Sequence, residues 1–233
     1  MSQHLKTKRQ LASEASKGTS SDPIYRTFEQ SLIQLNLKGD LLDFGAGTGN
    51  LSCRLQRLRR FNSITAIDIM ERPIAMDRSI KWLSWDLNET TAISDQVFDV
   101  IVSAEVIEHL ENPRAIAREW FRLLRPGGTL IFSTPNNESW RSLFALVLQG
   151  HFVAFGDNCY PAHITAIVRK DIARILNEAG FSGVQFTFTN FGRIPKLTKL
   201  HWQAISAGLL GGLRYSDNLL AIAHKPTGKS TQF

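Results

Sequence analysis

Cysteine is scarce in this chain, and the common export and membrane signals are absent. Cys53 and Cys159 are the only cysteines in 233 residues, and neither belongs to a Cys-x-x-Cys pair. This argues against a disulfide framework and predicts free thiols in a reducing, cytoplasmic setting. No apolar run reaches the roughly 18–20 residues that a transmembrane segment needs. Residues 1–21 are polar and unlike a secretory signal, so we expect a flexible N-terminal tail there.

Charge is also modest. Lys and Arg outnumber Asp and Glu by only six, and charged residues make up 21% of the chain. Dedicated nucleic-acid binders usually carry a denser basic surface, so we expect no nucleic-acid partner. The densest basic segment, Arg54–Arg60, favours the exposed face and C-terminal end of a helix, where cations oppose the negative end of the helix dipole.

Helical and strand patterns alternate from residue 22 onward. Short, nearly continuous apolar runs are typical of strands buried on both faces of a parallel sheet. We predict such strands at residues 41–45, 63–69, 80–85, 98–104 and 128–134. Helical spacing predicts helices from residue 22 and at residues 49–60, 71–79, 113–124, 137–149 and 168–179. This alternation indicates an α/β fold with a doubly wound sheet.

The last third of the chain is less regular. Residues 183–191 alternate apolar and polar side chains, which suits a strand near a sheet edge, and residues 218–224 predict a final strand. The length suits one substantial α/β domain. We therefore predict a single domain at residues 22–226, with insertions at about 135–166 and 192–216 and a C-terminal tail at 227–233.

A glycine-rich segment follows the first predicted strand. In Gly45-Ala46-Gly47-Thr48-Gly49, glycine allows a sharp turn and lets the main chain approach a ligand without a Cβ in the way. Asp68 ends the second predicted strand, where a carboxylate accepts hydrogen bonds from two ribose hydroxyls. A plain glycine turn and an ordinary strand-end aspartate are the structural alternatives. The loop, the following helix and the acid together indicate an adenosine-containing cofactor.

Four segments then occur in the order typical of one family. Leu41–Gly49 resembles the first motif of class I S-adenosylmethionine-dependent methyltransferases, and Trp85–Leu87 resembles their adenine-binding element. Phe98–Val102 resembles their fourth strand, and Leu124–Gly128 resembles the turn before their fifth strand. The resemblance covers about residues 40–190. It favours a methyl donor over NAD, which the glycine loop alone leaves open.

The resemblance implies a fold and a set of cofactor contacts. The fold is a Rossmann-like, seven-stranded, mostly parallel sheet with helices on both faces and an antiparallel last strand, here Asn218–His224. The implied cofactor is S-adenosylmethionine. The residues implied to surround it are Asp43, Gly45, Gly47 and Gly49 at the methionine moiety, Asp68 at the ribose, Asp86 and Leu87 at the adenine, and Ala104 near the sulfonium.

The candidate catalytic segment is Glu105-Val106-Ile107-Glu108-His109, directly after the fourth predicted strand. Open α/β sheets bind ligands at the carboxyl ends of their strands, so this position suits chemistry. The segment resembles that of ubiquinone-pathway O-methyltransferases and small-RNA 2′-O-methyltransferases, whose acids and histidine are associated with a divalent metal or with activation of the accepting hydroxyl. Our first hypothesis is that His109 accepts the hydroxyl proton, with Glu105 and Glu108 as further catalytic candidates.

A divalent metal is the second hypothesis for the same segment. Glu105, Glu108 and His109 would hold the ion, with His163 as a fourth ligand and His151 as a weaker candidate. Their spacing is not diagnostic of a metal site. A purely structural role for His109 is the third hypothesis.

The two insertions are the expected sources of an acceptor pocket. The first contains aromatic and histidine side chains that either wall an aromatic or lipid-like acceptor or pack a lid helix on the sheet, namely Trp140, Phe144, His151, Phe152, Phe155 and Tyr160. The second contains the apolar, glycine-rich residues 204–213. A membrane surface, a partner subunit and the substrate are candidates to cover them. Because this short segment has little basic fringe of its own, internal packing is favoured.

Taken together, these patterns predict a biosynthetic enzyme that O-methylates a hydroxyl of a small metabolite. The alternatives are an RNA 2′-O-methyltransferase, a non-catalytic adenosine-binding partner subunit and a nicotinamide-dependent oxidoreductase. The modest charge and the lack of a basic-aromatic groove argue against RNA. The intact glycine loop and Glu105–His109 segment argue against a non-catalytic subunit. No pattern identifies the acceptor, the pathway or the oligomeric state.

Overall fold

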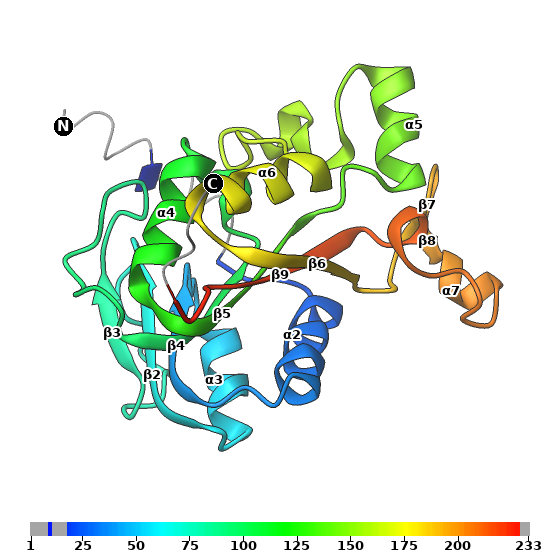
Figure 1. Ribbon diagram of the computed structural model, residues 1–233. Coiled ribbons are helices and arrows are strands. Elements are labelled where there is room, and N and C mark those ends of the chain that lie inside the picture. Colours follow the sequence, from blue (N-terminus) through cyan, green and yellow to red (C-terminus); the bar gives the residue numbers. More distant parts are fainter. Residues whose placement is uncertain (1–8, 11–17, 229–233) are drawn as a thin grey trace.

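A seven-stranded sheet forms the centre of the molecule in the computed structural model, which describes residues 9–10 and 18–228 (Figure 1). Its strand order is β3-β2-β1-β4-β5-β9-β6. The strands are β1 (Gly39–Phe44), β2 (Phe61–Asp68), β3 (Lys81–Ser84), β4 (Phe98–Ala104), β5 (Leu124–Pro135), β6 (Ser182–Phe188) and β9 (Asn218–His224). The first five strands pair in parallel, whereas β9 runs antiparallel to β5 and β6. The predicted sheet, its antiparallel last strand and its edge strand are confirmed.

Helices cover both faces of this sheet, as predicted. The helices α2 (Asp22–Gln34) and α3 (Asn50–Arg57) lie on one face, and α4 (Pro113–Leu123) and α6 (Arg169–Ala179) lie on the other (Figure 1). Successive side chains of a strand point to opposite faces. Leu41 therefore packs in the core under α2 and α3, while its neighbour Leu42 packs in the core under α4 and α6. Burial on both faces explains why the strand sequences are continuously apolar.

The predicted helix at residues 71–79 is wrong, because this connection is a loop without a helix. Pro73 cannot donate a main-chain hydrogen bond, and a proline disfavours helical geometry in the residue before it. The Arg72 side chain instead donates to the carbonyl oxygens of Asp77 and Ile80, both at 2.8 Å. Local side-chain bonds thus replace the helical ladder that the apolar spacing suggested.

The two predicted insertions form a separate lobe at one end of the sheet (Figure 1). Its regular elements are α5 (Trp140–Gln149), a two-stranded ribbon of β7 (Arg193–Ile194) and β8 (Leu197–His201), and α7 (Trp202–Ile205). Short 3-10 turns complete the described elements at Ile107–His109, Val153–Phe155, Asp157–Cys159 and Leu213–Tyr215. Within the described ranges, the helices are too short or too polar to cross a membrane.

The predicted internal packing of residues 204–213 is wrong. Leu209 is 88% exposed and Ile205 is 58% exposed. The segment lies outside the sheet, after the β7–β8 ribbon, where no helix covers it within the described residues. Its apolar character therefore needs a different explanation.

Candidate active site

A cavity of about 870 Å³ lies at the carboxyl ends of the parallel strands. Because strands run parallel through β5, the residues that follow them meet at one edge of the sheet. This brings nine of the predicted site residues to the cavity wall, namely Asp43, Gly45, Gly47, Asp68, Asp86, Leu87, Ala104, Glu105 and His109. Gly49 and Glu108 do not line it. Gly49 is instead the N-terminal cap residue of α3, and Glu108 is fully buried behind the wall.

The glycine loop has the geometry that its sequence predicts. Gly45 and Gly47 have φ values of +83° and +53°, a region that L residues with a Cβ seldom adopt. A Cβ at Gly45 would collide with the Val106 side chain, and a Cβ at Gly47 would collide with the carbonyl oxygen of Gly18. Both positions therefore need glycine for its conformation and for its lack of a side chain.

The described part of the predicted N-terminal tail is held against this loop. Thr48 donates from its main-chain N to the Gly18 carbonyl oxygen at 2.9 Å. Arg9 pairs with Asp86 at 2.9 Å and with Glu111 at 2.7 Å, on the side predicted for the adenine. Residues 9–10 and 18–21 of the predicted tail thus have defined contacts with the domain, while residues 1–8, 11–17 and 229–233 lie outside the described residues. Sequence reasoning missed Arg9 because its partners lie about 80–100 positions away.

Asp43 presents an unsatisfied carboxylate oxygen beside the glycine loop. Its Oδ2 accepts a hydrogen bond from Ser52 Oγ at 2.5 Å, whereas its Oδ1 has no partner among the described residues. Burial raises the pKa of this carboxyl to about 7. A buried, unpaired carboxylate oxygen is costly unless a cation or donor meets it. The site therefore suits the ammonium group of a methionine moiety.

The contacts of Asp68 fit both hypotheses for this residue, namely an ordinary strand-end aspartate and a ribose-binding carboxylate. Its Oδ2 accepts from the main-chain N of Gly47 at 2.7 Å, and its Oδ1 accepts from the main-chain N of Met70 at 2.9 Å. These bonds fix the turn after β2, as an ordinary strand-end aspartate would. Burial raises the pKa of Asp68. Each carboxylate oxygen has a second lone pair, so this cavity-lining side chain retains capacity for ribose hydroxyls.

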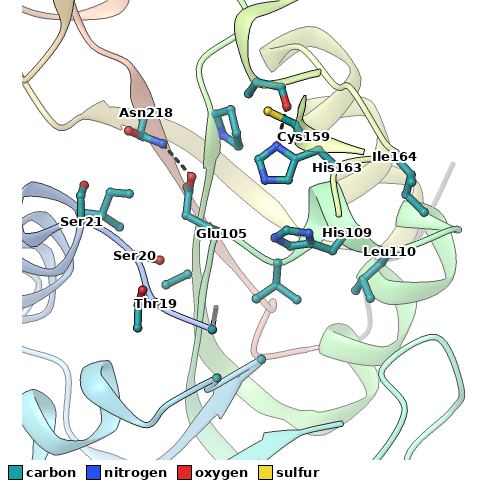
Figure 2. A pocket seen from close by; sticks show the side chains of 18 of the residues that line it. Thr19, Ser20, Ser21, Glu105, His109, Leu110, Cys159, His163, Ile164 and Asn218 are labelled. Atoms are coloured by element: carbon teal, nitrogen blue, oxygen red, sulfur yellow. Dashed lines mark hydrogen bonds between the residues drawn. The ribbon is translucent and has the colours of Figure 1, made fainter. Parts of the chain in front are cut away.

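Glu105 occupies a strained position at the end of β4. Its φ is +56°, which is unfavourable for a residue with a Cβ and is common where a site is held in place. Ser133 Oγ donates to Oε1 at 2.8 Å. Asn218 Nδ2 donates to Oε2 at 2.7 Å (Figure 2). Burial raises the pKa of Glu105 to about 7. Sequence reasoning missed Asn218, because only the pairing of β9 with β5 brings it near Glu105.

His109 and His163 lie face to edge at the cavity wall, with ring centroids 4.7 Å apart (Figure 2). His109 Nδ1 lies 2.7 Å from the Ala162 carbonyl oxygen, and His163 Nδ1 lies 2.6 Å from that of Ala154. A carbonyl oxygen only accepts, so each Nδ1 carries the hydrogen and each Nε2 keeps a lone pair. Burial lowers the pKa of His109 to about 4 and also lowers that of His163. Both rings are therefore neutral near pH 7.

Glu108 completes a cluster with these two histidines. One ligand atom from each of Glu108, His109 and His163 lies within 4.8 Å of the other two. Glu108 Oε2 accepts from Thr134 Oγ1 at 3.2 Å, and Oε1 has no partner among the described residues. Burial and the neighbouring Glu105 raise the Glu108 pKa well above its ordinary value. Two neutral imidazoles and a carboxyl are a donor set that fits a divalent cation. Glu105 and His151, both in the sequence-based hypothesis, are not part of this cluster.

A further part of the cavity wall, which we call the acceptor end, carries a net positive charge. Arg141 and Arg193 both line it, and they share the carboxylate of Asp217 at 3.4 Å and 3.8 Å. Burial lowers the pKa of Arg141 and raises that of Asp217. Two guanidinium groups face a single carboxylate, so this end favours an acceptor with an acidic group.

A family model described as a methyltransferase domain matches residues 17–185. The chain belongs to this family. A solved S-adenosylmethionine-dependent methyltransferase from Archaeoglobus fulgidus shares the fold, with a TM-score of 0.64 at 17% identity over 91% of this chain and 97% of the other. The predictions of a class I methyltransferase and of S-adenosylmethionine as its cofactor are confirmed at the level of the family.

Ubiquinone biosynthesis O-methyltransferases are similar in sequence. The protein from Pseudomonas fluorescens strain Pf0-1 is 33% identical over 124 residues, which cover 49% of this chain and 52% of that protein. The one from Psychrobacter arcticus is 26% identical over 186 residues, covering 75% of this chain and 70% of that protein. This chain spans about half the length of most of these relatives.

Proposed function

We propose that this chain transfers the methyl group of S-adenosylmethionine to a hydroxyl oxygen of a small acceptor. The observation that carries the proposal is the unpaired Oδ1 of Asp43, beside two glycines whose Cβ positions are blocked. A buried anion in a glycine cradle fits a cationic amino acid moiety, as S-adenosylmethionine has. Asp68 would hold the ribose, Asp86 and Leu87 the adenine, and Ala104 would lie near the sulfonium.

The chemistry requires an acceptor for the hydroxyl proton. The bound cofactor supplies a methyl group on a cationic sulfur, whose carbon–sulfur bond breaks as the new carbon–oxygen bond forms. His109 Nε2 takes the proton, because its other nitrogen is committed to the Ala162 carbonyl oxygen and its ring lines the cavity. Glu105 acts as a positioning residue. Its two carboxylate oxygens accept hydrogen bonds from Ser133 and Asn218, and these bonds hold the cavity wall in place.

A divalent cation is a second candidate for hydroxyl activation, favoured by the unpaired Glu108 Oε1. Glu108, His109 and His163 would hold the ion, which would lower the pKa of an accepting hydroxyl. Titration of Mn²⁺ into the full chain tests this independently of activity. Binding that Glu108→Gln abolishes supports the cation, whereas no Mn²⁺ binding and chelator-insensitive turnover support His109 as the base.

The acceptor end suggests which hydroxyl compounds to test. The similar ubiquinone-pathway proteins are named O-methyltransferases, and Arg141 with Arg193 favours an acidic group on the acceptor. The experiment is a screen of phenolic and sugar-like hydroxyl compounds for release of S-adenosylhomocysteine, with 3,4-dihydroxybenzoate and catechol as a matched pair. We expect faster turnover of the carboxylate at equal concentration. Failure to bind S-adenosylmethionine in calorimetry, with binding of NADH instead, would overturn the methyltransferase proposal.

We further propose that residues 22–226 act as one catalytic domain and that the protein works in the cytoplasm. The continuous sheet from β1 to β9 supports the first point. The free thiols of Cys53 and Cys159 support the second, since reducing compartments preserve them. RNA methylation stays the alternative, tested by salt-sensitive binding of RNA oligonucleotides.

A further inference from the structure

The helix α5 has its apolar side facing outward. Amphipathic helices of globular proteins usually bury their large apolar side chains and expose their polar ones. In α5 the buried residues are the small Ser142 and Ala145. The large apolar side chains Phe144, Val147 and Leu148 are 50%, 81% and 69% exposed. Their spacing of three and four residues places them on one stripe of the helix, so α5 presents an apolar stripe to its surroundings.

A second segment at the same end of the molecule also exposes large apolar side chains. In residues 191–215, the exposed apolar side chains are Leu197, Leu200, Ile205 and Leu209. Arg214 joins this segment to α5, because its guanidinium lies 5.2 Å from the Trp140 ring and donates to the Glu138 carbonyl oxygen at 2.7 Å. We call residues 139–156 and 191–215 the docking lobe. The lobe holds nine of the fifteen large apolar side chains that are exposed within the described part of the chain.

Charge distinguishes the docking lobe from the rest of the molecule. Its 43 residues contain no Asp or Glu, and its five cationic residues are Arg141, Arg193, Lys196, Lys199 and Arg214. Arg141 and Arg193 share the carboxylate of Asp217, which lies just outside these ranges, so the lobe as a whole keeps a net positive charge. Lys196 and Lys199 are exposed and alternate with the exposed Leu197 and Leu200. The neighbouring β7–β8 ribbon thus supplies the basic side chains that residues 204–213 themselves lack.

We propose that the docking lobe binds the surface of an anionic phospholipid bilayer. Exposed apolar side chains fringed by the exposed cations Lys196 and Lys199 match a surface that is apolar inside and negatively charged at its headgroups. Nucleic acid would use the cations but leave the apolar side chains uncovered. The lobe also supplies Ser142, Val153 and Arg193 to the wall of the cavity. Docking therefore brings the acceptor end of the cavity next to the membrane.

Co-sedimentation of the full chain with vesicles tests the proposal. We expect binding to phosphatidylcholine vesicles that contain phosphatidylglycerol, and much weaker binding to phosphatidylcholine alone. The double variant Val147→Glu/Leu209→Glu should lower binding by about tenfold or more, because two buried apolar contacts are lost. Lys196→Gln/Lys199→Gln should weaken binding only to the anionic vesicles. Because all four positions are exposed, the unfolding temperature of both variants should change little. Thermal unfolding therefore serves as the control that the variants fold.

Ile74→Glu is the matched control, because Ile74 is fully exposed and lies outside the lobe. It should bind vesicles like the unaltered chain. Absence of vesicle binding, or equal loss in the control, would overturn the proposal. A dimer that light scattering detects, and that the double variant Val147→Glu/Leu209→Glu converts to monomers, would also overturn the proposal, since the lobe would then bind a second copy of the chain. Salt-sensitive RNA binding that is lost only in the lysine variant would likewise assign the lobe to nucleic acid.

Discussion

The cofactor end and the acceptor end of the cavity are built in different ways. At the cofactor end, the turn after β1 and the end of β2 meet where the main-chain N of Gly47 donates to the Asp68 carboxylate. At the acceptor end, Arg141, Arg193 and Asp217 come from segments far apart in the chain. The proposed cofactor end depends on a glycine main-chain turn and on the carboxylates of Asp43 and Asp68, which few residue types can replace. The proposed acceptor end depends on side chains that the insertions supply, and insertions can change without disturbing the sheet.

The largest expected effect separates chemistry from cofactor binding. His109→Ala should lower turnover by roughly 10²–10⁴-fold, since it removes the proposed proton acceptor, while calorimetric affinity for S-adenosylmethionine stays close to that of the unaltered chain. Release of S-adenosylhomocysteine measures the turnover. His151→Ala is the control, because His151 lies outside the cluster of Glu108, His109 and His163. Unaltered turnover in His109→Ala would leave His109 with a structural role only.

A pair of glycine substitutions compares the cofactor loop with a glycine at the end of α5, outside the cavity wall. Gly47→Ala should weaken binding of S-adenosylhomocysteine by about tenfold or more, because it combines a left-handed φ with a collision at the Gly18 carbonyl oxygen. Gly150 ends α5 at φ +80° with nothing within 4 Å of its Cβ position. Gly150→Ala should therefore cost about 1–2 kcal/mol of stability without affecting the cofactor. Calorimetry measures the binding of S-adenosylhomocysteine, and thermal unfolding measures the stability. An equal loss of binding in the two variants would contradict the proposed approach of the loop to the cofactor.

The pH dependence of cofactor binding tests Asp43. Burial raises the pKa of its carboxyl to about 7, and only the ionised form attracts an ammonium group. Affinity for S-adenosylmethionine should therefore fall as the pH drops below 7, by roughly fivefold between pH 7 and pH 6 as the competent fraction shrinks. Asp43→Asn should bind more weakly and lose this pH dependence. A flat profile for the unaltered chain would exclude Asp43 as the partner of the ammonium group.

The smallest effect is expected on the surface of the docking lobe. Val147→Ser should change the free energy of unfolding by less than about 0.5 kcal/mol, because Val147 is 81% exposed. Val102→Ser, in the fully buried centre of β4, should cost about 2 kcal/mol or more, since it removes apolar burial and leaves a hydroxyl in the core. Chemical denaturation measures both. A large loss in Val147→Ser would show that α5 packs its apolar stripe within the protein.

Most of the sheet and the cofactor loop were predictable from local patterns. Continuous apolar runs located the five parallel strands, and the helix at residues 168–179 follows from its spacing and from Gly180 at its end. The helix predicted at residues 71–79 was wrong, since its apolar spacing ignored Pro73 and the hydrogen bonds of Arg72. The position of the candidate catalytic segment was predictable, but which of its side chains line the cavity was not, because the cavity-lining His109 directly follows the buried Glu108.

By itself, the sequence determined the glycine loop, the acid after β2 and the family, because these depend on backbone freedom and on neighbours along one strand and turn. The tertiary structure decided which side chains meet. It brought Asn218 to Glu105 through the antiparallel pairing of β9, and it brought His163 rather than His151 to His109. It also turned the large side chains of α5 outward. Helical periodicity fixes which residues share a face, but only packing against the rest of the chain decides where that face points.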